Sequence, residues 1–403
     1  MEQATIAKME DLPPLSSVKI DGDYCGTCTR CVVACPFEAV SIDKTAKKAR
    51  LDIEKCQVCG ICSAACPASA IDIEYFDEDS LFAYVKKSIN AIGFQDLVLA
   101  CKASSPSEIE TSEELKERGL KDSFLLRLPC VGRVSAQFYL ESLATGVKRV
   151  ITLRCEDKFC RFKNGSRVNA LLLSLTDLLL EQLGFDGDTL LSATSSPKAI
   201  FDSSKCVGCD KCKFVCPFDA IRVKPMGTPE IDPESCVGCG ACAIVCPHQA
   251  MQLKGFEYDR TWRLAQKYAA EALKKPRITR PAVLVFVCQW CEFHESNNLP
   301  DKKPENLWFI EIPCAKALDP AHVLSALHSG FDGVFAATCS EDDCRLEEGK
   351  EVAVRNVDVL KKVLQHLHLL DKFEICSASP RYVGDFSSKL RHFLDSLPPR
   401  EPS

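Results

Sequence analysis

The sequence predicts an architecture of α+β and α/β modules in alternation, and three observations support it. Four groups of four cysteines share one spacing, and short apolar strands alternate with helical stretches after each pair of groups. The whole pattern then occurs a second time. Because the cysteines of the two occurrences stay in register, the repeat indicates a tandem duplication.

The composition indicates a metalloprotein rather than a secreted disulfide-linked protein. The chain has 403 residues and 26 cysteines, and its first twenty residues are polar and acidic, without an apolar signal segment. The longest apolar segment, residues 170–180, contains Asp177 and is too short to span a membrane. We therefore expect a cytoplasmic protein of anaerobic metabolism. A net charge of −6 with both signs mixed does not indicate a nucleic-acid surface.

A loose arm is expected at residues 1–20, followed by a first cysteine-rich module at residues 21–76. Each cysteine run has intervals of two, two and three residues and ends in Cys-Pro. This is the bacterial ferredoxin spacing, in which three cysteines of one run and the last cysteine of the other run bind one 4Fe–4S cluster. The rule gives one cluster to Cys25, Cys28, Cys31 and Cys66, and a second to Cys56, Cys59, Cys62 and Cys35.

The cysteine loops contain glycines, which we expect to take positive φ and to turn N–H groups toward the clusters: Gly26, Gly60, Gly208, Gly238 and Gly240. Apolar neighbours are expected to cover the clusters: Val32, Val33, Phe37, Ile61, Phe214, Phe218 and Ile244. Structural zinc is the alternative, but zinc needs only four ligands per site and does not explain the third cysteine or the Cys-Pro ending.

An α/β module is predicted at residues 77–197. A helix is expected from an N-cap at Asp79 to Ile92, stopped by Gly93. Apolar strands then lead to Cys101, Cys130 and Cys155, with helices at about 134–145 and 166–184 and a last strand at 189–193. Open parallel sheets bind ligands at the carboxyl ends of their strands, which is where these cysteines fall. Three arginines flank cysteines and are expected to be ordinary surface charges: Arg133, Arg154 and Arg161.

The pattern restarts with a second cysteine-rich module at residues 198–257 and a second α/β module at 258–403. The spacing rule gives one cluster to Cys206, Cys209, Cys212 and Cys246, and its twin to Cys236, Cys239, Cys242 and Cys216. A helix is expected at 260–274, followed by strands leading to Cys288, Cys314 and Cys339. Only this copy continues to a last helix, at about 384–396, after a strand near 373–377.

The second α/β module carries a family resemblance. Its motifs are Cys288-Gln-Trp-Cys291, Cys314 ahead of Asp319-Pro320, and Gly330-Phe-Asp-Gly-Val334 ahead of Cys339 and Cys344. Over roughly residues 282–397 these resemble the iron–sulfur delta subunit of methyl-viologen-reducing hydrogenase (MvhD-like), and residues 96–195 resemble it more weakly. Ala315-Lys316 replaces a Gly-Arg step of that family, and Ser104 replaces a cysteine. The expected fold is thus ferredoxin-like two-cluster modules alternating with small MvhD-like parallel-sheet domains.

The resemblance implies a 2Fe–2S cluster. Four thiolates satisfy such a cluster, and the first copy retains Cys101, Cys130, Cys155 and Cys160. Their counterparts are Cys288, Cys314, Cys339 and Cys344. This assignment leaves Cys291 as a fifth cysteine in copy two, which we keep as a possible ligand. We therefore expect one or two 2Fe–2S clusters. Cys376 is expected to be a buried core thiol.

The expected function is electron transfer in a redox complex. No glycine-rich dinucleotide motif, Walker loop or catalytic motif is found, so neither flavin nor nucleotide is expected. The resemblance implies single-electron relay between a catalytic subunit, such as a hydrogenase or formate dehydrogenase, and a heterodisulfide-reductase-A-like flavoprotein, with electron bifurcation as one option. The alternatives are a thiol–disulfide oxidoreductase using Cys288 and Cys291, an input subunit of a benzoyl-CoA-reductase-type complex, and a redox sensor.

Overall fold

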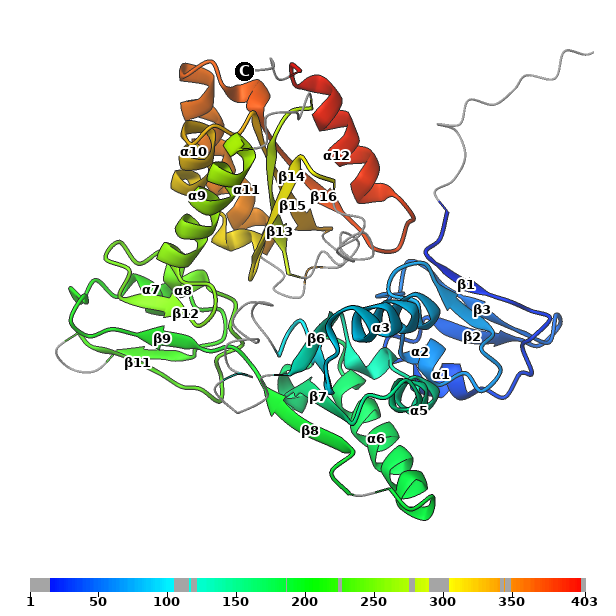
Figure 1. Cartoon of the computed structure of the whole chain (residues 1–403). Helices are drawn as coiled ribbons and strands as arrows, with labels where there is room; N and C mark the ends of the chain where they lie inside the picture. Colours follow the sequence, from blue (N-terminus) through cyan, green and yellow to red (C-terminus); the bar gives the residue numbers. More distant parts are fainter. Residues whose placement is uncertain are drawn as a thin grey trace, which may run out of the picture.

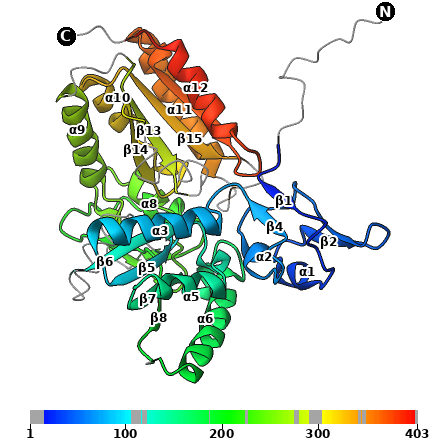
Figure 2. The same ribbon diagram turned by 45° about the vertical axis from the view of Figure 1, so that its right-hand side comes forward.

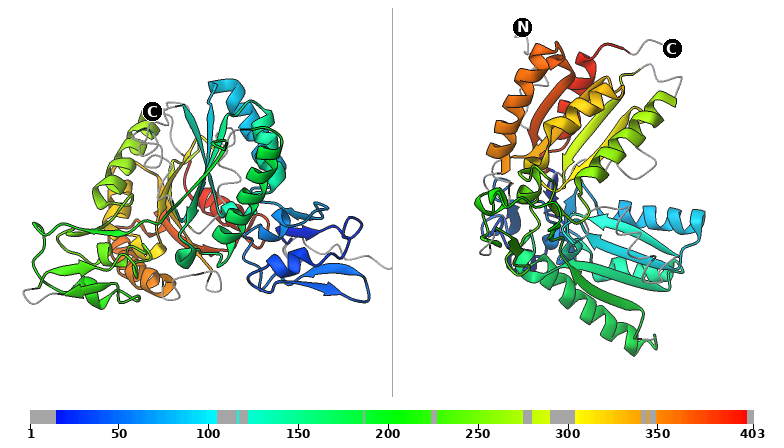
Figure 3. Two further views of the ribbon diagram at one scale, coloured as in Figure 1. Left: turned by 90° about the horizontal axis from the view of Figure 1, so that it is seen from below. Right: turned by 90° about the vertical axis from the view of Figure 1, so that its left-hand side faces the viewer.

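The computed structural model contains two small modules and two parallel-sheet modules (Figure 1). It describes residues 15–104, 116, 122–185, 187–223, 227–274, 280–289, 304–340, 344 and 349–399. We call residues 15–197 copy one and residues 198–403 copy two. The two small modules lie at opposite sides of the molecule, and the sheets lie between them (Figure 3). The predicted fold class is confirmed.

Each small module consists of two short helices and two two-stranded antiparallel sheets. In copy one the elements are β1 (Val18–Ile20), α1 (Arg30–Ala34), β2 (Val40–Asp43), β3 (Lys48–Leu51), α2 (Ile61–Ala64) and β4 (Ile71–Ile73). In copy two they are β9 (Ala199–Phe201), α7 (Lys211–Phe214), β10 (Ile221–Val223), β11 (Pro229–Ile231), α8 (Ala241–Ile244) and β12 (Met251–Leu253). The small core of each module combines cysteines with aliphatic side chains.

The end of the expected loose arm is ordered. β1 pairs antiparallel with β4, and Val18 lies opposite Ile73. Ser17 is buried and its backbone N–H donates to the carbonyl oxygen of Arg381, which belongs to copy two. Residues 15–20 are therefore part of the folded structure, because copy two supplies backbone partners for them.

The two α/β modules have the same element order. In copy one it is α3 (Glu78–Ile92), β5 (Asp96–Cys101), β6 (Ser123–Leu128), η2 (Val131–Arg133), α5 (Ala136–Ala144), β7 (Arg149–Cys155), η3 (Asp157–Phe159), α6 (Gly165–Gln182) and β8 (Leu190–Ser195). In copy two it is α9 (Tyr258–Lys274), β13 (Val283–Cys288), β14 (Leu307–Ile312), η6 (Ala315–Ala317), α10 (Pro320–His328), β15 (Gly333–Cys339), α11 (Gly349–His366), η8 (Leu370–Lys372), β16 (Phe373–Ala378) and α12 (Asp385–Ser396).

The first helix of the α/β module in copy one, α3, begins earlier than predicted. Its N-cap is Asp77, whose carboxylate accepts a hydrogen bond from the Ser80 N–H at 2.7 Å, and not Asp79. Asp79 lies in the first turn, where the helix dipole favours a negative charge, so both residues suit a helix start. Gly93 ends the helix at φ 68°, as predicted.

Both four-stranded sheets are wholly parallel, with the orders β6-β5-β7-β8 and β14-β13-β15-β16. The central strands β5, β13 and β15 are largely apolar and buried along their whole length, which is typical of strands covered on both faces. Cys101 and Cys155 end their strands, and so do Cys288 and Cys339. The carboxyl ends of the strands therefore bring the cysteines of each copy to one edge of its sheet.

Copy two continues into a further helix after its last strand. This helix, α12, covers a face of the second sheet, where Phe335 packs against Phe386 and Phe393 at ring-centroid distances of 6.0 and 5.5 Å (Figure 2). In copy one β8 instead continues almost directly into β9 of the second small module. The predicted difference between the two copies is thus present.

The two sheets share one hydrophobic cluster, and a buried ion pair joins their edge strands. Arg127 of β6 and Glu311 of β14 form two hydrogen bonds, at 2.8 and 3.0 Å, and both side chains are largely buried. The two residues are 184 residues apart. Cys130 and Cys314, which follow the same two strands, have this same separation. Equivalent positions of the two copies therefore face each other, which indicates a local two-fold relation between the sheets.

Candidate metal centres

Three of the four predicted sets of four cysteines each line one pocket. We call the set Cys35, Cys56, Cys59 and Cys62 inner site one, and it lines a pocket of about 340 Å³. Inner site two (Cys216, Cys236, Cys239 and Cys242) and outer site two (Cys206, Cys209, Cys212 and Cys246) line pockets of about 350 and 370 Å³. Each pocket combines cysteines from both runs of its module, as the spacing rule predicts.

The fourth set, Cys25, Cys28, Cys31 and Cys66, is called outer site one. The charges of Cys66 and Cys25 act on Cys31, although burial is the main reason that the pKa of Cys31 is raised. The backbone N–H of Ala49 donates to the Sγ of Cys25 at 3.4 Å. The three thiols are therefore near one another, as this set requires.

The backbone supplies N–H groups to the sulfurs of these sites. Val58 N–H donates to Cys56 Sγ and Gly208 N–H donates to Cys206 Sγ, both at 3.4 Å. Positive φ is found at four of the five glycines expected to have it: Gly60, Gly208, Gly238 and Gly240. Gly26 is not among them. Thr27 has φ 52° and Val58 has φ 50° at the positions that Gly208 and Gly238 hold in copy two.

The sites resemble binding sites for a multi-iron cluster more than sites for one ion. In the described part of the chain, no three His, Cys, Asp or Glu residues converge closely enough to hold one metal ion. Burial raises the pKa of Cys62 to about 12 and also raises the pKa of Cys59 and Cys242. Ligation requires thiolates, so iron binding would release protons from these sites.

Copy one gathers its four strand-end cysteines into a buried group. Hydrogen bonding from Cys130 and Cys155 lowers the pKa of Cys101, and hydrogen bonding from Cys155 lowers the pKa of Cys160 to about 7. A Cβ on Gly165 would lie only 2.4 Å from the Cys130 sulfur, so the start of α6 requires glycine there. We call this group the four-thiol site of copy one.

Copy two brings the equivalent cysteines to the same edge of its sheet. The Sγ atoms of Cys288 and Cys339 are 3.7 Å apart, and Cys314 is buried. Cys344 is half-buried against the shared hydrophobic cluster. Cys291 lies outside the described residues. Cys376, expected to be a buried core thiol, is half-buried on β16, and burial raises its pKa to about 12.

Each inner site lies beside the cysteine group of its α/β module. In copy one Cys59 and Cys130 belong to one small hydrophobic cluster, and the charge of Cys59 contributes to raising the pKa of Cys130. In copy two the Cβ position of Gly240 lies 3.1 Å from Pro313, which precedes Cys314. Both copies therefore place an outer site, an inner site and a strand-end cysteine group in series.

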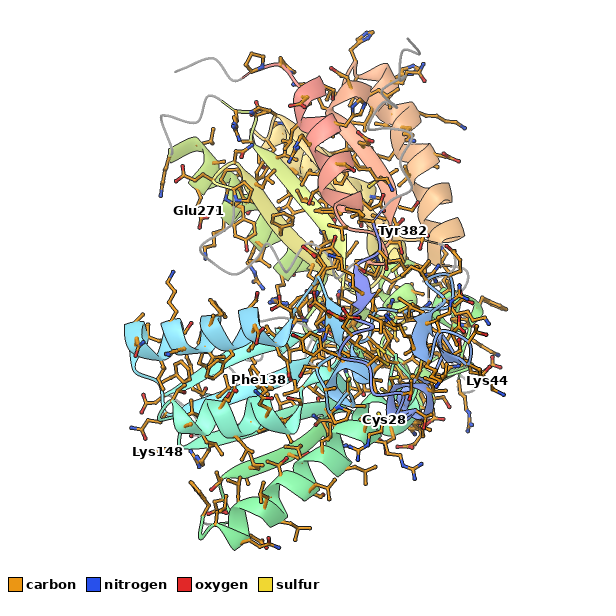
Figure 4. All side chains as sticks on the ribbon, turned by 90° about the vertical axis from the view of Figure 1, so that its right-hand side faces the viewer. Cys28, Lys44, Phe138, Lys148, Glu271 and Tyr382 are labelled. Carbon is orange, nitrogen blue, oxygen red and sulfur yellow. The ribbon has the colours of Figure 1, made fainter. Side chains whose placement is uncertain are left out.

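The outer sites lie at the molecular surface. Cys28 and Cys209 are exposed (Figure 4 labels Cys28). Val33 and Phe214, which were expected to cover clusters, are 83% and 84% exposed. This expectation was wrong because the short helices α1 and α7 turn these side chains away from the module cores.

Cationic side chains near the inner sites were the main features that the sequence interpretation missed. Arg133, expected to be a surface charge, is 4% exposed and donates to the carbonyl oxygen of Val58 at 3.4 Å. Arg381 is equally buried and donates to the carbonyl oxygen of Cys56 at 2.9 Å. Lys198 donates to the carbonyl oxygen of Cys236 at 3.0 Å. Arg154, by contrast, is partly exposed and bonds Ser192.

A sequence signal for two of these cations exists. The strand β8 is followed by Ser196-Pro197-Lys198, and the equivalent strand β16 is followed by Ser379-Pro380-Arg381. The two tripeptides occupy the same place in the repeat. Their shared Ser-Pro-cation pattern could have indicated a common role.

The fold and these cysteine sets define the class of the protein, a multi-cluster iron–sulfur protein. The sequence model for the methyl-viologen-reducing hydrogenase delta subunit matches residues 97–201 and 283–398, which together exceed half of the chain. The chain belongs to this family. Models of a 4Fe-4S dicluster domain match residues 24–79 and 199–253. Two dicluster domains imply four 4Fe–4S clusters.

Relatives include components of two kinds of redox enzyme. Over 171 residues, 42% of this chain, it is 37% identical to the A subunit of ferredoxin:CoB-CoM heterodisulfide reductase from Methanosarcina mazei, covering 21% of that protein. The corresponding ferredoxin/F(420)H(2)-dependent protein of Methanosarcina acetivorans is 36% identical over 200 residues, 49% of this chain and 24% of that protein. The iron-sulfur D subunit of the F420-non-reducing hydrogenase from Archaeoglobus profundus is 29% identical over 90 residues, 22% of this chain and 66% of that protein.

The chain thus spans about a fifth to a quarter of the length of the heterodisulfide reductase proteins that it matches. It is an iron–sulfur electron-transfer subunit related to hydrogenase delta subunits and to the A subunit of heterodisulfide reductase. Among the described residues, none of the helices combines the length and apolar character needed to cross a bilayer.

Proposed function

We propose that the chain relays single electrons between a catalytic subunit and a heterodisulfide-reductase-A-like flavoprotein. The observation that supports this proposal most directly is the series of thiol sites in each copy. An exposed outer site leads to a buried inner site, and the inner site adjoins the cysteines at the end of the sheet. A series of closely placed centres is what stepwise electron transfer requires.

The proposed ligands are those that the spacing assigns. The sixteen cysteines of the two small modules would hold four 4Fe–4S clusters. Cys101, Cys130, Cys155 and Cys160 would hold a 2Fe–2S cluster, and Cys288, Cys314, Cys339 and Cys344 a second one. The clusters would supply the redox chemistry, since they accept and release single electrons. The protein supplies thiolates, keeps water away from the inner sites and fixes the spacing between sites.

The surface of the outer sites supports docking of partners at both ends of the molecule. Val33 of copy one and Phe214 of copy two hold equivalent positions beside the exposed Cys28 and Cys209. An exposed apolar side chain next to a redox centre is suited to a partner that must approach it closely. We propose a hydrogenase, a formate dehydrogenase or another reductase at one end, and the flavoprotein at another position of the same cytoplasmic, anaerobic complex.

A thiol–disulfide oxidoreductase is the second candidate, because Cys288 lies 3.7 Å from Cys339. Its reactive thiol would have to meet a substrate, yet Cys288 is 2% exposed. Reactive cysteines are partly exposed, whereas buried ones are structural or ligate metals. Burial of Cys288 therefore favours the electron-relay proposal.

The test is anaerobic purification of the native complex, with iron, flavin and companion subunits measured together. Four 4Fe–4S and two 2Fe–2S clusters would give about 20 iron atoms per chain, and flavin should be found only in a companion subunit. A colourless chain loaded with zinc, or one that reduces a small disulfide unaided and loses this activity in Cys291→Ser, would contradict the proposal.

A further inference from the structure

We propose that Arg381 and Arg133 raise the reduction potential of inner site one above that of inner site two, so that electrons pass from copy two toward copy one. This inference rests on the proposed ligation of a 4Fe–4S cluster at each inner site. It depends on which charged side chains contact the two equivalent cysteine loops, residues 56–60 and 236–240.

A cation that follows the last strand of an α/β module contacts the first cysteine of each loop. Arg381 follows β16 in copy two, and its Nε donates to the Cys56 carbonyl oxygen of copy one at 2.9 Å. Lys198 directly follows the α/β module of copy one, and its Nζ donates to the Cys236 carbonyl oxygen of copy two at 3.0 Å. The same carbonyl therefore receives a positive charge in both copies, from the same place in the repeat.

The contact of Arg381 is part of an extended interface with the first small module. The residue after it, Tyr382, forms a β-bridge to Ser16, and its hydroxyl donates to a Glu54 carboxylate oxygen at 2.7 Å. Figure 4 shows Tyr382 at the junction of the two copies. The Tyr75 hydroxyl further accepts the Gly384 N–H at 2.9 Å. These bonds hold the guanidinium of Arg381 in a fixed place.

The two cations differ in their surroundings. The Arg381 side chain is 5% exposed, and the carboxylate of Glu54, 3.8 Å away, is 69% exposed and therefore solvated. The Lys198 side chain is 23% exposed and lies 3.7 Å from the partly buried carboxylate of Glu156. Lys198 is therefore more solvated than Arg381, and a partly buried carboxylate offsets more of its charge. Both effects weaken its electrostatic field at the loop.

Inner site one has a second buried cation, Arg133, which the 184-residue offset aligns with Ala317; the side chain of the neighbouring Lys316 lies outside the described part of the chain. Arg133 contacts the loop through the Val58 carbonyl oxygen, and the Cβ position of Gly60 lies 2.6 Å from its side chain. The nearby Glu78 is largely buried, which raises the pKa of its carboxyl, while the charge of Arg133 acts to lower it.

A cluster gains one negative charge on reduction, so a nearby cation stabilises the reduced form and raises the potential. The effect is larger for buried charges, because the effective dielectric constant is lower away from water. Among the described side chains, two buried guanidiniums contact the loop of inner site one and one half-buried ammonium contacts the loop of inner site two. This difference predicts the higher potential for inner site one.

The experiment is an anaerobic potentiometric titration followed by electron paramagnetic resonance, on the full chain with its clusters. In Arg381→Gln we expect the ratio of reduced to oxidised inner site one to fall about tenfold at a fixed ambient potential, which is about 59 mV for a one-electron couple. Cys59→Ser, which alters the signal of this site, identifies the component to follow. Arg50→Gln, an exposed charge of the same module, is the matched control and should leave the ratio unchanged.

Arg381→Lys separates the effect of the charge from the effect of the loop position, because lysine keeps the positive charge but lacks the planar, forked guanidinium. A ratio close to that of the unmodified chain in Arg381→Lys supports the proposal. Equal shifts in the lysine and glutamine variants would show that loop position matters and would overturn it, as would an unmodified chain in which inner site two has the higher potential. Absence of 4Fe–4S signals from the unmodified chain would instead refute the proposed function itself.

Discussion

In copy one the inner cysteine loop is held by two buried arginines, whereas in copy two the equivalent loop is held by a half-buried lysine. The strands, helices and cysteines that surround these loops occupy matching places in both copies. The comparison teaches that the scaffold and the thiols were kept after duplication, while the charges around them diverged. A duplicated electron-transfer module can in this way acquire two ends with different properties.

The largest effect should come from removing iron. This experiment tests whether the small modules of copy one and copy two depend equally on their clusters for folding. Their cores are small and include cysteines beside a few aliphatic side chains, while the parallel sheets have extensive apolar cores of their own. Metal binding and folding are coupled in such small modules. Complete chelation should therefore expose both small modules to proteolysis and leave both sheets resistant. An unchanged circular dichroism spectrum after full iron loss would contradict this expectation.

Replacing Cys101 tests whether copy one matches copy two at the end of the sheet. If its four-thiol site binds a 2Fe–2S cluster, Cys101→Ser should lose about two iron atoms per chain together with part of the 2Fe–2S signal. Cys288→Ser is the matched variant in copy two and should lose the other part. Unchanged iron content and an unchanged signal in Cys101→Ser would restrict the cluster to copy two.

Charge reversal at the contact between the sheets should have a smaller effect. Arg127→Glu places two largely buried carboxylates opposite each other, and breaking a buried ion pair costs about 3–5 kcal/mol. Denaturant unfolding at constant cluster content would measure the loss. The double variant Arg127→Glu/Glu311→Arg restores opposite charges and should recover most of the stability. Equal stability of the single and double variants would show that this pair does not join the copies.

The sequence was sufficient to predict the fold and the grouping of the cysteines. Ferredoxin spacing is local, and strand-end cysteines follow from apolar periodicity, so both can be recognised without tertiary information. The pockets combine the cysteines that this spacing predicts. The N-cap at Asp77 was missed because Asp79, only two residues later, offers an equally good signal for a helix start.

Burial of charged residues could not be predicted in the same way. Arg133 follows a cysteine in the sequence much as Arg154 precedes one, yet only Arg133 packs under a loop of the small module. The role of Arg381 depends on a contact between residues 325 positions apart. Val58 has φ 50° although it is β-branched, and Gly238 holds the equivalent position in copy two. The Val58 side chain is accommodated in the first module, where it is buried, whereas a Cβ on Gly238 would clash with Pro197.

The pair of Arg127 and Glu311 also limits what this molecule could have been before its halves were joined. Two identical chains related by a two-fold axis would bring the same side chain against itself at this point, and no single residue type is both cation and anion. The present pairing therefore could arise only after the two halves had come to differ in sequence. Splitting the gene between the halves would give two different proteins, each needing the other, and neither half could assemble with itself in the same way.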